Sequence, residues 1–399
     1  MQKIYKVAIV GGGASGLLTA VELLNGNSPF LGSEVAVFER NDRVGKKLIA
    51  TGNGQGNLTN ANLSAQRYRG EKRVIDAFLQ HENNINLSQY LEDLGIPLRT
   101  LNDGKKYPLS RQASAVLDII RAFLESKNCQ VQVGLKVLSV KKKGEIFTLE
   151  TNNGIFYAEK VVLAFGGAVA KQFGTDGTSY ALAENFGHRK TKLFPALVQL
   201  KTKTDYIRGL KGLKEVAKVT LLIDGKPIFE SVGDLLFTDY GVSGSTIFQI
   251  SAYYKGEKNA RLKVEFLPEL SLSQIEEMLV KRQGLNYFNG ENMLCGVLNK
   301  RIGQAVIKFA KNQSPKAVAC AIKGFELEVT GALGFDYAQV TKGGIETKDV
   351  CEKTFESKLQ KGLYIVGEAL DIDGDCGGFN LAFAFVSAIA VARGIKNSF

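Results

Sequence analysis

The chain has 399 residues, of which 45% are hydrophobic and 23% charged, and its formal net charge is +11. This length exceeds what one hydrophobic core usually organises, so we expect two or three domains, and the composition excludes the disordered and fibrous classes. The five cysteines form no C-x-x-C pair and there are only two histidines, which argues against a disulfide framework, a metal centre and a histidine triad. We therefore expect an organic cofactor to carry the chemistry.

The positive charge is compatible with a nucleic-acid partner or an anionic substrate. The lysines, however, are spread along the whole chain, and the only tight run, residues 141–143, is predicted to lie in a solvated hairpin turn. This distribution argues against a nucleic-acid partner and favours a small-molecule substrate.

The chain enters an apolar strand at once without a signal-type segment, which predicts a cytoplasmic protein. The most apolar stretch, Phe379 to Ala392, is shorter than the roughly 20 residues that span a bilayer. We expect this stretch to be a buried helix and expect no membrane partner.

The first elements form a strand, a glycine turn and a helix. An apolar strand at residues 6–10 runs into Gly11, Gly13 and Gly16, which have the G-x-G-x-x-G spacing, and an apolar-periodic helix follows at 17–24. In a dinucleotide-binding unit the first glycine makes the turn, the second admits the pyrophosphate, and the third lets the helix pack on the strand. The alternative is a glycine turn in an α/β unit that binds no ligand.

A second apolar strand, residues 34–38, ends at Glu39, 23 residues after Gly16. This separation places an acid on the adenosine ribose of a dinucleotide, and a carboxylate there favours an unphosphorylated ribose. The next run, residues 40–60, is rich in Gly, Asn and Thr, so its backbone amides are suited to wrap an extended cofactor. The alternative for this run is a disordered loop.

Helical periodicity predicts helices at 72–95 and 113–127. Alternating residues and turn signals between 130 and 157 predict a three-stranded antiparallel excursion, and a buried strand at 160–164 then ends in a small-residue turn suited to the same cofactor. A short helix is expected from Thr175 to the Gly187 stop.

The character of the sequence changes near residue 191. Several short strands and hairpin turns precede a helical stretch in which Ser273 and Glu276 have the spacing of a capping box, and a second helix is expected at 297–309. We predict an α/β protein whose Rossmann-like domain carries an inserted β-barrel-like domain and a small helical subdomain. The predicted boundaries are 1–190 plus 331–399, 191–270 plus 320–330, and 271–319.

The C-terminal elements are a buried strand at 362–367 that ends at Glu368, a tight loop at 371–378, and an apolar helix from Phe379 to Arg393. An acid at a strand end is suited to hold ribityl hydroxyls, and the positive end of the helix is suited to stabilise negative charge on a reduced flavin. The alternative is that Glu368 only caps the next element.

Several motifs carry a resemblance to a known family: the glycine turn with Glu39, Lys46 to Asn60, Ala164 to Gly167, Phe237 to Gly244, Val340 to Gly344, and Gly367 to Leu381. Together they resemble the HI0933-like, aminoacetone oxidase-type FAD-binding flavoproteins over essentially the whole chain. The resemblance implies FAD bound in a glutathione-reductase-type fold. Family members include oxidases of amino ketones and reductases of steroid enones, so the resemblance does not fix a substrate.

The cofactor segments and the resemblance together predict 21 FAD-binding residues, namely Gly11, Gly13, Ala14, Ser15, Gly16, Glu39, Arg40, Lys47, Leu48, Thr51, Gly52, Asn53, Asn57, Val137, Ala164, Gly166, Gly367, Glu368, Gly378, Asn380 and Leu381. The sequence departs from the family pattern at Gln55-Gly56, where Arg-Cys is usual, and at Asp239-Tyr240, where a histidine is usual. Asp239 and Tyr240 are candidates for a base, but no catalytic residue is assigned.

We predict an FAD-dependent oxidoreductase that acts on a small metabolite by hydride transfer to or from flavin N5. It would be an amine or aminoacetone-type oxidase or an NAD(P)H-linked reductase. No second G-x-G-x-x-G unit is present, so any NAD(P)H is expected to visit the flavin transiently, and oxygen is the alternative oxidant. A flavin-dependent tRNA-modifying protein and a flavin-binding protein without turnover are the other hypotheses.

Overall fold

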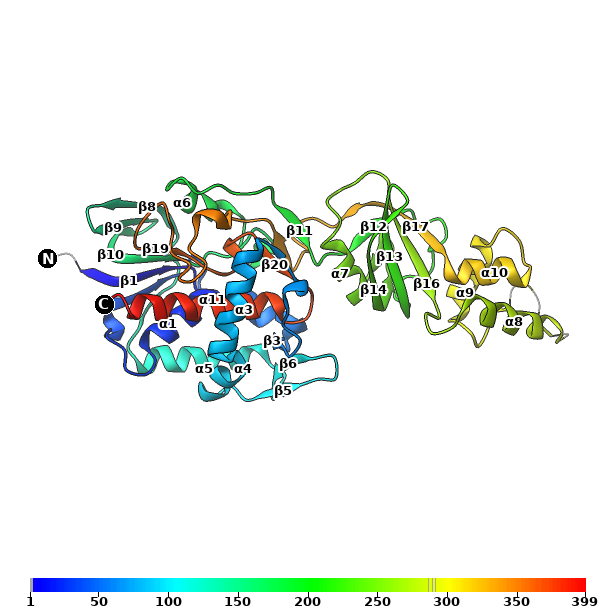
Figure 1. Cartoon of the computed structure of the whole chain (residues 1–399), viewed down its shortest axis with the longest axis horizontal. Helices are drawn as coiled ribbons and strands as arrows, with labels where there is room; N and C mark the ends of the chain where they lie inside the picture. Colours follow the sequence, from blue (N-terminus) through cyan, green and yellow to red (C-terminus); the bar gives the residue numbers. More distant parts are fainter. Residues whose placement is uncertain (1–2, 286, 289, 291) are drawn as a thin grey trace. The chain divides into compact units, whose positions relative to one another are not determined.

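The computed structural model describes residues 3–285, 287–288, 290 and 292–399. The chain forms two compact units, one of Met1–Phe194 with Val340–Phe399 and the other of Pro195–Gln339 (Figure 1). The chain crosses between the units at the short strands β11 (Phe194–Ala196) and β18 (Val340–Lys342). Each unit is described by itself.

The first unit is built on a seven-stranded sheet in the order β7-β2-β1-β10-β9-β8, with β19 also paired to β10. The strands are β1 (Ile4–Val10), β2 (Val35–Phe38), β7 (Gln130–Gln132), β8 (Val137–Lys143), β9 (Ile146–Thr151), β10 (Gly154–Leu163) and β19 (Leu363–Ile365). Parallel register places Val10 beside Phe38 and Leu163, and Leu163 beside Ile365. The carboxyl ends of these four strands therefore meet at one edge, where α/β sheets bind their ligands.

β10 corrects the prediction of two separate strands near residues 155–164. Its first half pairs antiparallel with β9, and its second half pairs parallel with β1 and β19. The antiparallel excursion and the main sheet are thus one sheet. The lysine run at 141–143 lies in β8 rather than in a turn, because the strand continues to Lys143 and pairs with Ile146.

The helices of the first unit are α1 (Ala14–Leu24), α2 (Lys46–Ala50), α3 (Lys72–Ile85), α4 (Leu87–Asp93), α5 (Ala113–Ser126), α6 (Ala181–Glu184) and α11 (Phe379–Lys396). The single helix predicted at 72–95 is two helices, since Asn86 has a left-handed backbone (φ 51°) that ends α3 and caps α4. A small sheet consists of β3 (Thr59–Asn60), β6 (Lys105–Pro108) and β5 (Leu98–Thr100) in that order. A second small sheet pairs β4 (Tyr68–Gly70) with β20 (Ile372–Gly374). β20 lies inside the segment predicted as a tight loop.

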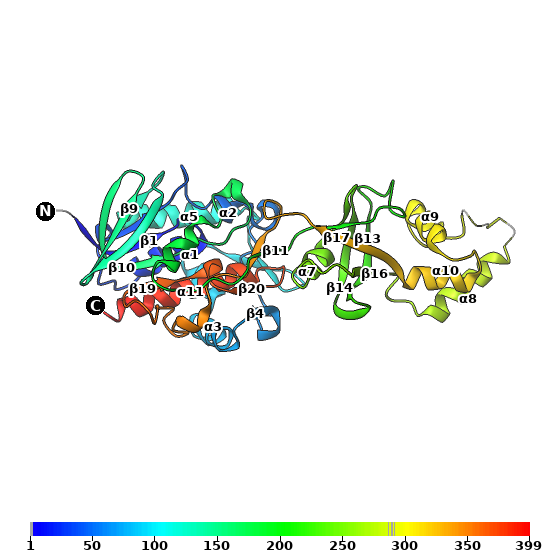
Figure 2. The same ribbon diagram turned by 90° about the horizontal axis from the view of Figure 1, so that it is seen from above.

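α1 and α11 lie side by side in both views (Figures 1 and 2). The buried Glu22 of α1 accepts hydrogen bonds from Arg393 (3.1 Å) and Lys396 (3.3 Å) of α11. α11 is long and apolar enough to cross a membrane, but 72% of it is buried inside the structure, as expected for a core helix. The two ends of the chain are therefore held together.

The second unit contains a closed barrel in the order β12-β15-β14-β13-β16-β17. Its strands are β12 (Leu200–Thr202), β13 (Lys214–Ile223), β14 (Lys226–Phe237), β15 (Gly241–Ser243), β16 (Ala260–Phe266) and β17 (Phe325–Ala332). Its helices are α7 (Ser245–Ser251), α8 (Leu272–Gln283), α9 (Lys300–Phe309) and α10 (Pro315–Lys323). Ile275, Ile302 and Val318 from three helices are buried in the same cluster as Phe266 and Phe325 of the barrel, so barrel and helices share one core.

The capping box of α8 is formed by Ser271 and Gln274 instead of Ser273 and Glu276. The Ser271 hydroxyl accepts from the Gln274 N–H (3.2 Å), and the Gln274 side chain accepts from the Ser271 N–H (2.8 Å). The sequence contains both spacings, and the helix starts at the earlier one. α10 begins at Pro315 behind the N-cap Ser314, a start signal that the sequence prediction missed.

Candidate cofactor site

The glycine turn follows β1 at the carboxyl edge of the sheet. Gly11 has φ +112°, and a Cβ there would lie 2.4 Å from the Ala164 carbonyl oxygen, so only glycine fits against the end of β10. A Cβ on Gly16 would lie 1.8 Å from the Gly11 oxygen, which explains the close contact between helix and turn. At Gly13, no heavy atom lies within 4 Å of the Cβ position, so the turn has open space there. This is the geometry that a pyrophosphate needs.

The N-terminus of α1 is suited to bind an anion. Gly13 is the N-cap and makes no side-chain cap, and the first turn holds no acidic residue. The first intrahelical bond is donated by Leu17 to the Gly13 oxygen, so the preceding N–H groups, among them those of Ala14 and Ser15, have no partner within the helix. Aligned, uncapped N–H groups beside open space attract a phosphate.

Glu39 lies directly after β2 and is buried. One carboxylate oxygen accepts from the Gly12 N–H (2.8 Å), and the other accepts from the backbone N–H and the side-chain amide of Asn41 (2.8 Å each). The carboxylate is thereby fixed against the glycine turn with lone pairs left for ribose hydroxyls. The backbone carbonyl oxygen of Glu39 accepts a hydrogen bond from the Leu135 N–H (2.9 Å). This contact brings Val137, at the start of β8, near the same strand end.

Arg40 follows Glu39 and forms a two-pronged ion pair with Asp176 at 2.9 Å for each contact. The Arg40 guanidinium holds the pKa of Asp176 well below its usual range, and Thr178 donates two further hydrogen bonds to the same carboxylate. The Arg40 side chain, predicted to bind the cofactor, therefore anchors the segment at 176–178.

The loop after α2 turns through consecutive left-handed residues, Gly52 (φ 57°) and Asn53 (φ 55°). Thr51 donates to the carbonyl of the buried Leu48 (2.7 Å), which ties the loop to α2. Asn57, in the amide orientation that satisfies both neighbours, accepts from the Gly378 N–H (3.1 Å) and donates to the Thr59 oxygen (3.2 Å). The N-terminal loop thus contacts the start of α11 directly.

Glu368 joins four segments of the first unit. Its carboxylate accepts from the Lys47 ammonium (2.6 Å) and from the Thr341 N–H (2.8 Å), while the Thr341 hydroxyl accepts from the Ala168 N–H (2.8 Å). Gly166, with φ +76°, lies beside the same carboxylate. Both oxygens of Glu368 are engaged with other segments, so the side chain does not simply cap its own turn. Thr341 belongs to this group, although the sequence predicts only its motif, Val340 to Gly344, and not the residue itself.

Gly367 and Gly378 allow close approaches between the two ends of the chain. A Cβ on Gly367 would lie 2.8 Å from the Ser15 hydroxyl, and a Cβ on Gly378 would lie 2.4 Å from the Thr59 oxygen. Gly378 is the N-cap of α11 and makes no side-chain cap, and the first turn, which includes Leu381, has no acidic residue. A second uncapped helix N-terminus therefore lies near the Asn57 loop.

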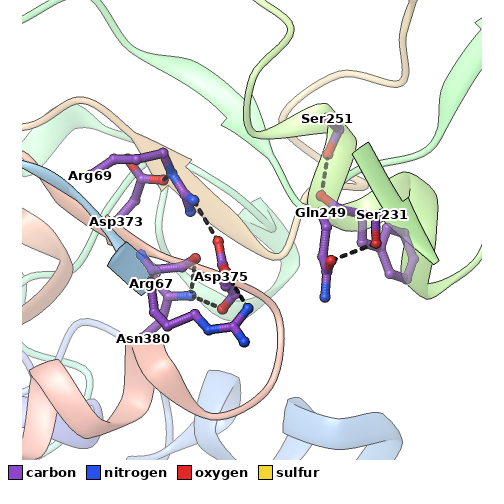
Figure 3. Close-up of polar contacts among 10 residues, drawn as sticks. Arg67, Arg69, Ser231, Gln249, Ser251, Asp373, Asp375 and Asn380 are labelled. Atoms are coloured by element: carbon purple, nitrogen blue, oxygen red, sulfur yellow. Dashed lines mark hydrogen bonds and ion pairs between the residues drawn. The ribbon is translucent and has the colours of Figure 1, made fainter. Parts of the chain in front are cut away.

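The Asn380 side chain closes the loop before α11 (Figure 3). Its amide exchanges two 2.8 Å hydrogen bonds with the backbone of Gly374 and donates to the Asp375 oxygen (3.2 Å). Nearby, Arg69 pairs with the buried Asp373 and Asp375 at 2.6 Å each. Asn380, predicted as a flavin contact, thus uses its side chain to shape this loop.

The candidates for a base, Asp239 and Tyr240, lie in the turn between β14 and β15 of the second unit. Asp239 is exposed and accepts a hydrogen bond from Lys211 (2.7 Å), which lowers its pKa. The Tyr240 carbonyl accepts from the Thr202 N–H (3.1 Å). In the same unit Ser231 donates to Gln249 (2.6 Å; Figure 3). Among the described residues, no group of three or more His, Cys, Asp and Glu side chains could hold a metal ion.

A family model for the HI0933-like protein Rossmann domain matches residues 5–394. The chain belongs to the HI0933-like family. One HI0933-like relative, a 3-dehydro-bile acid delta(4,6)-reductase of Clostridium scindens, is 32% identical, covering 97% of this chain and 98% of its own. A ribosomal RNA dihydrouridine synthase of Haemophilus influenzae is 26% identical over 99% of this chain and all of its own.

Among solved structures, a 3-ketosteroid-delta4-(5alpha)-dehydrogenase of Rhodococcus jostii matches with a TM-score of 0.53 at 13% identity, over 99% of this chain and 98% of that one. At this identity the match shows the fold alone. The predicted family and the Rossmann-type FAD-binding fold with an inserted barrel are confirmed. The HI0933-like chain is an FAD-dependent oxidoreductase, as predicted.

Proposed function

We propose that this protein uses FAD to reduce a carbon–carbon double bond conjugated with a carbonyl group. The two curated relatives above differ in substrate, but the reaction in each name is of this type. A 3-dehydro-bile acid with a 4,6-diene is a dienone, and the bond reduced to make dihydrouridine is conjugated with a uracil carbonyl. Both relatives align over nearly the full chain, so the shared chemistry is the observation that carries the proposal.

Bound FAD would supply hydride chemistry at its N5. The β-carbon of the enone would receive that hydride and the α-carbon a proton from solvent, so that the substrate gains two hydrogens. The residues of this chain supply binding and electrostatics. The uncapped N-termini of α1 and α11 offer N–H groups to anions, the first suited to the pyrophosphate and the second to negative charge on a reduced flavin.

The α11 N-terminus has no acid in its first turn, so it is suited to stabilise an anionic reduced flavin, the species that both the proposed reduction and the alternative oxidation pass through. A carboxylate there would repel an anionic reduced flavin, whereas the helix dipole favours it. Lys47, held by Glu368 at 2.6 Å, adds a cation to the segment that precedes the Asn53 loop. We propose NAD(P)H as the electron donor. The alternative reaction is oxidation of an amino ketone, which the test below distinguishes from reduction.

The test uses purified FAD-loaded protein under anaerobic conditions. NADH or NADPH is expected to bleach the flavin, and a 3-oxo-4-ene steroid or free uridine, offered separately, is screened for reoxidation with a product two mass units heavier. Each half-reaction is read by the flavin spectrum. Flavin that is reduced by an amino ketone and reoxidised only by oxygen would overturn the proposal.

A further inference from the structure

The strand β6 places two polar side chains against the loops of the proposed cofactor site. A Cβ placed on Gly52 would lie 3.3 Å from Cε1 of Tyr107, and a Cβ placed on Gly377 would lie 3.5 Å from Cε of Lys105. Lys105 and Tyr107 are two residues apart in the strand, so they share one of its faces. We call these two residues the β6 face. It lies against both loops.

The two loops are those expected to surround the flavin ring. Gly52 lies in the left-handed turn after α2, and Gly377 lies just before the uncapped N-terminus of α11. The Asn60 side chain donates to the Gly377 oxygen (2.9 Å), and Asn60 also pairs with Lys105 across β3 and β6. These contacts fix β6 to the segment that starts α11. A substrate that reaches the flavin ring at this end is therefore expected to meet the β6 face.

Tyr107 combines a fixed ring with a free hydroxyl. Its side chain is half-buried, and within residues 3–285, 287–288, 290 and 292–399 its hydroxyl has no hydrogen-bond partner. Gly52 lies against the ring edge, and the Arg111 guanidinium lies 5.4 Å from the ring centroid. Burial raises the pKa of the phenol, although the charges of Lys105 and Arg111 oppose this effect. The phenol is therefore protonated at neutral pH and able to donate a hydrogen bond.

The groups beside Tyr107 are weaker candidates for the same task. The Lys105 ammonium donates to the Asp103 carboxylate (2.7 Å), so its charge is already paired. Cys376 lies near Lys105, and burial raises the pKa of its thiol, which leaves a neutral S–H group that donates only weakly. Of these side chains, Tyr107 offers the strong donor that the protein has not used.

We propose that the Tyr107 hydroxyl donates a hydrogen bond to the carbonyl oxygen of the conjugated substrate. The inference rests on the proposed function. When the β-carbon receives hydride, the π electrons of the double bond shift toward the carbonyl oxygen, which gains negative charge. A solvent proton at the α-carbon then restores the carbonyl, and Tyr107 keeps its own proton. A donor that is fixed before the reaction stabilises this charge without having to reorganise.

The alternative role of Tyr107 is packing alone, and Tyr107→Phe separates the two roles. The variant keeps the ring contacts with Gly52 and Arg111 but loses the hydroxyl. Tyr157→Phe is the matched control, because Tyr157 is also half-buried and lies in the first unit. It lies in β10, six residues and roughly 20 Å before the carboxyl end of that strand at Leu163.

The first measurement is isotope-edited infrared spectroscopy of a 3-oxo-4-ene steroid, or of uridine, with an isotope-labelled carbonyl, bound to the oxidised FAD-loaded protein. A hydrogen bond from Tyr107 weakens the C=O bond. The carbonyl frequency is therefore expected to be lower in the wild type and in Tyr157→Phe than in Tyr107→Phe. Equal frequencies in all three proteins, or the absence of binding by both compounds, would overturn the proposal.

The second measurement follows the two half-reactions by the flavin spectrum. Tyr107→Phe is expected to slow reoxidation of the reduced flavin by the bound enone about 100-fold, the usual effect of removing one such donor. Binding of the enone should weaken by less than about tenfold, and FAD affinity and reduction by NAD(P)H should not change. Tyr157→Phe is expected to match the wild type throughout.

The two measurements distinguish this inference from the proposed function. A frequency difference without reduction of either compound would overturn the proposed reaction but retain the hydrogen bond. Reduction at equal rates and with equal carbonyl frequencies in the wild type and Tyr107→Phe would overturn the role of Tyr107 alone. Flavin content and circular dichroism verify that each variant is folded.

Discussion

Replacing Gly13 by Asp separates the stability of the fold from the binding of FAD. Gly13 has an ordinary backbone (φ −85°), and no heavy atom lies within 4 Å of its Cβ position, so the larger side chain enters without strain. Asp is also among the best N-cap residues, and the change from glycine is worth a few tenths of a kcal/mol to α1. We therefore expect the apoprotein to keep or slightly gain stability.

The same carboxylate occupies the space proposed for the pyrophosphate. At about 5 Å and an effective dielectric constant of about 20, one pair of like charges repels by roughly 3 kcal/mol, which corresponds to at least about a 100-fold loss of FAD affinity. The Asp side chain also accepts from the N–H groups that the phosphate needs. The expected result is a folded but colourless protein.

The assay is titration of deflavinated protein with FAD, followed by flavin fluorescence, alongside thermal unfolding of the apoprotein. Gly334→Asp is the matched control, because Gly334 also has open space at its Cβ position but lies in the second unit. Gly13→Asp that binds FAD as tightly as Gly334→Asp would refute the assignment of the glycine turn to the cofactor.

Three further predictions follow from individual contacts. Lys47→Met is expected to leave the Glu368 carboxylate without its cation and to weaken FAD retention about tenfold. Lys46→Met, which breaks a pair with the exposed Asp42 (2.5 Å), should have little effect in the same titration. Glu22→Gln is expected to cost about 2 kcal/mol in urea unfolding, because α11 loses the buried carboxylate that binds Arg393. Burial raises the pKa of Glu82 to about 7 from its usual 4.5. The contribution of Glu82 to the free energy of unfolding is therefore complete below about pH 4.5 and falls by roughly 3 kcal/mol as the pH rises through 7. Comparison of the wild type with Glu82→Gln at pH 5 and pH 8 measures this loss, and an equal change of unfolding free energy in both proteins would contradict it.

The sequence was informative where structure depends on neighbouring residues. The strand, glycine turn and helix at the N-terminus follow from local spacing, and the steric reason is seen at Gly11 and Gly16, where a side chain would overlap backbone atoms. The apolar periodicity of α5 and the buried strand before Glu368 are equally local signals. These elements were placed to within a few residues.

What the sequence could not show depends on contacts between distant segments. Lys47 and Glu368 are 321 residues apart, and nothing in either motif specifies that they pair. Arg40 is predicted to bind the cofactor, but its motif does not specify that its guanidinium pairs with Asp176, 136 residues later. β10 was divided into two strands because its sequence does not reveal that it changes from an antiparallel to a parallel partner along its length.

The distribution of charge at the proposed cofactor site shows the same limit. The cations at the proposed cofactor site, Arg40 and Lys47, are each paired with a carboxylate, so attraction for FAD comes mainly from backbone N–H groups at helix N-termini. Such short-range contacts in a partly buried site are weakly screened by salt. Raising the salt concentration from about 50 to about 200 mM should therefore leave the flavin bound, and loss of flavin over this range would mean that charged side chains, rather than backbone N–H groups, carry the attraction.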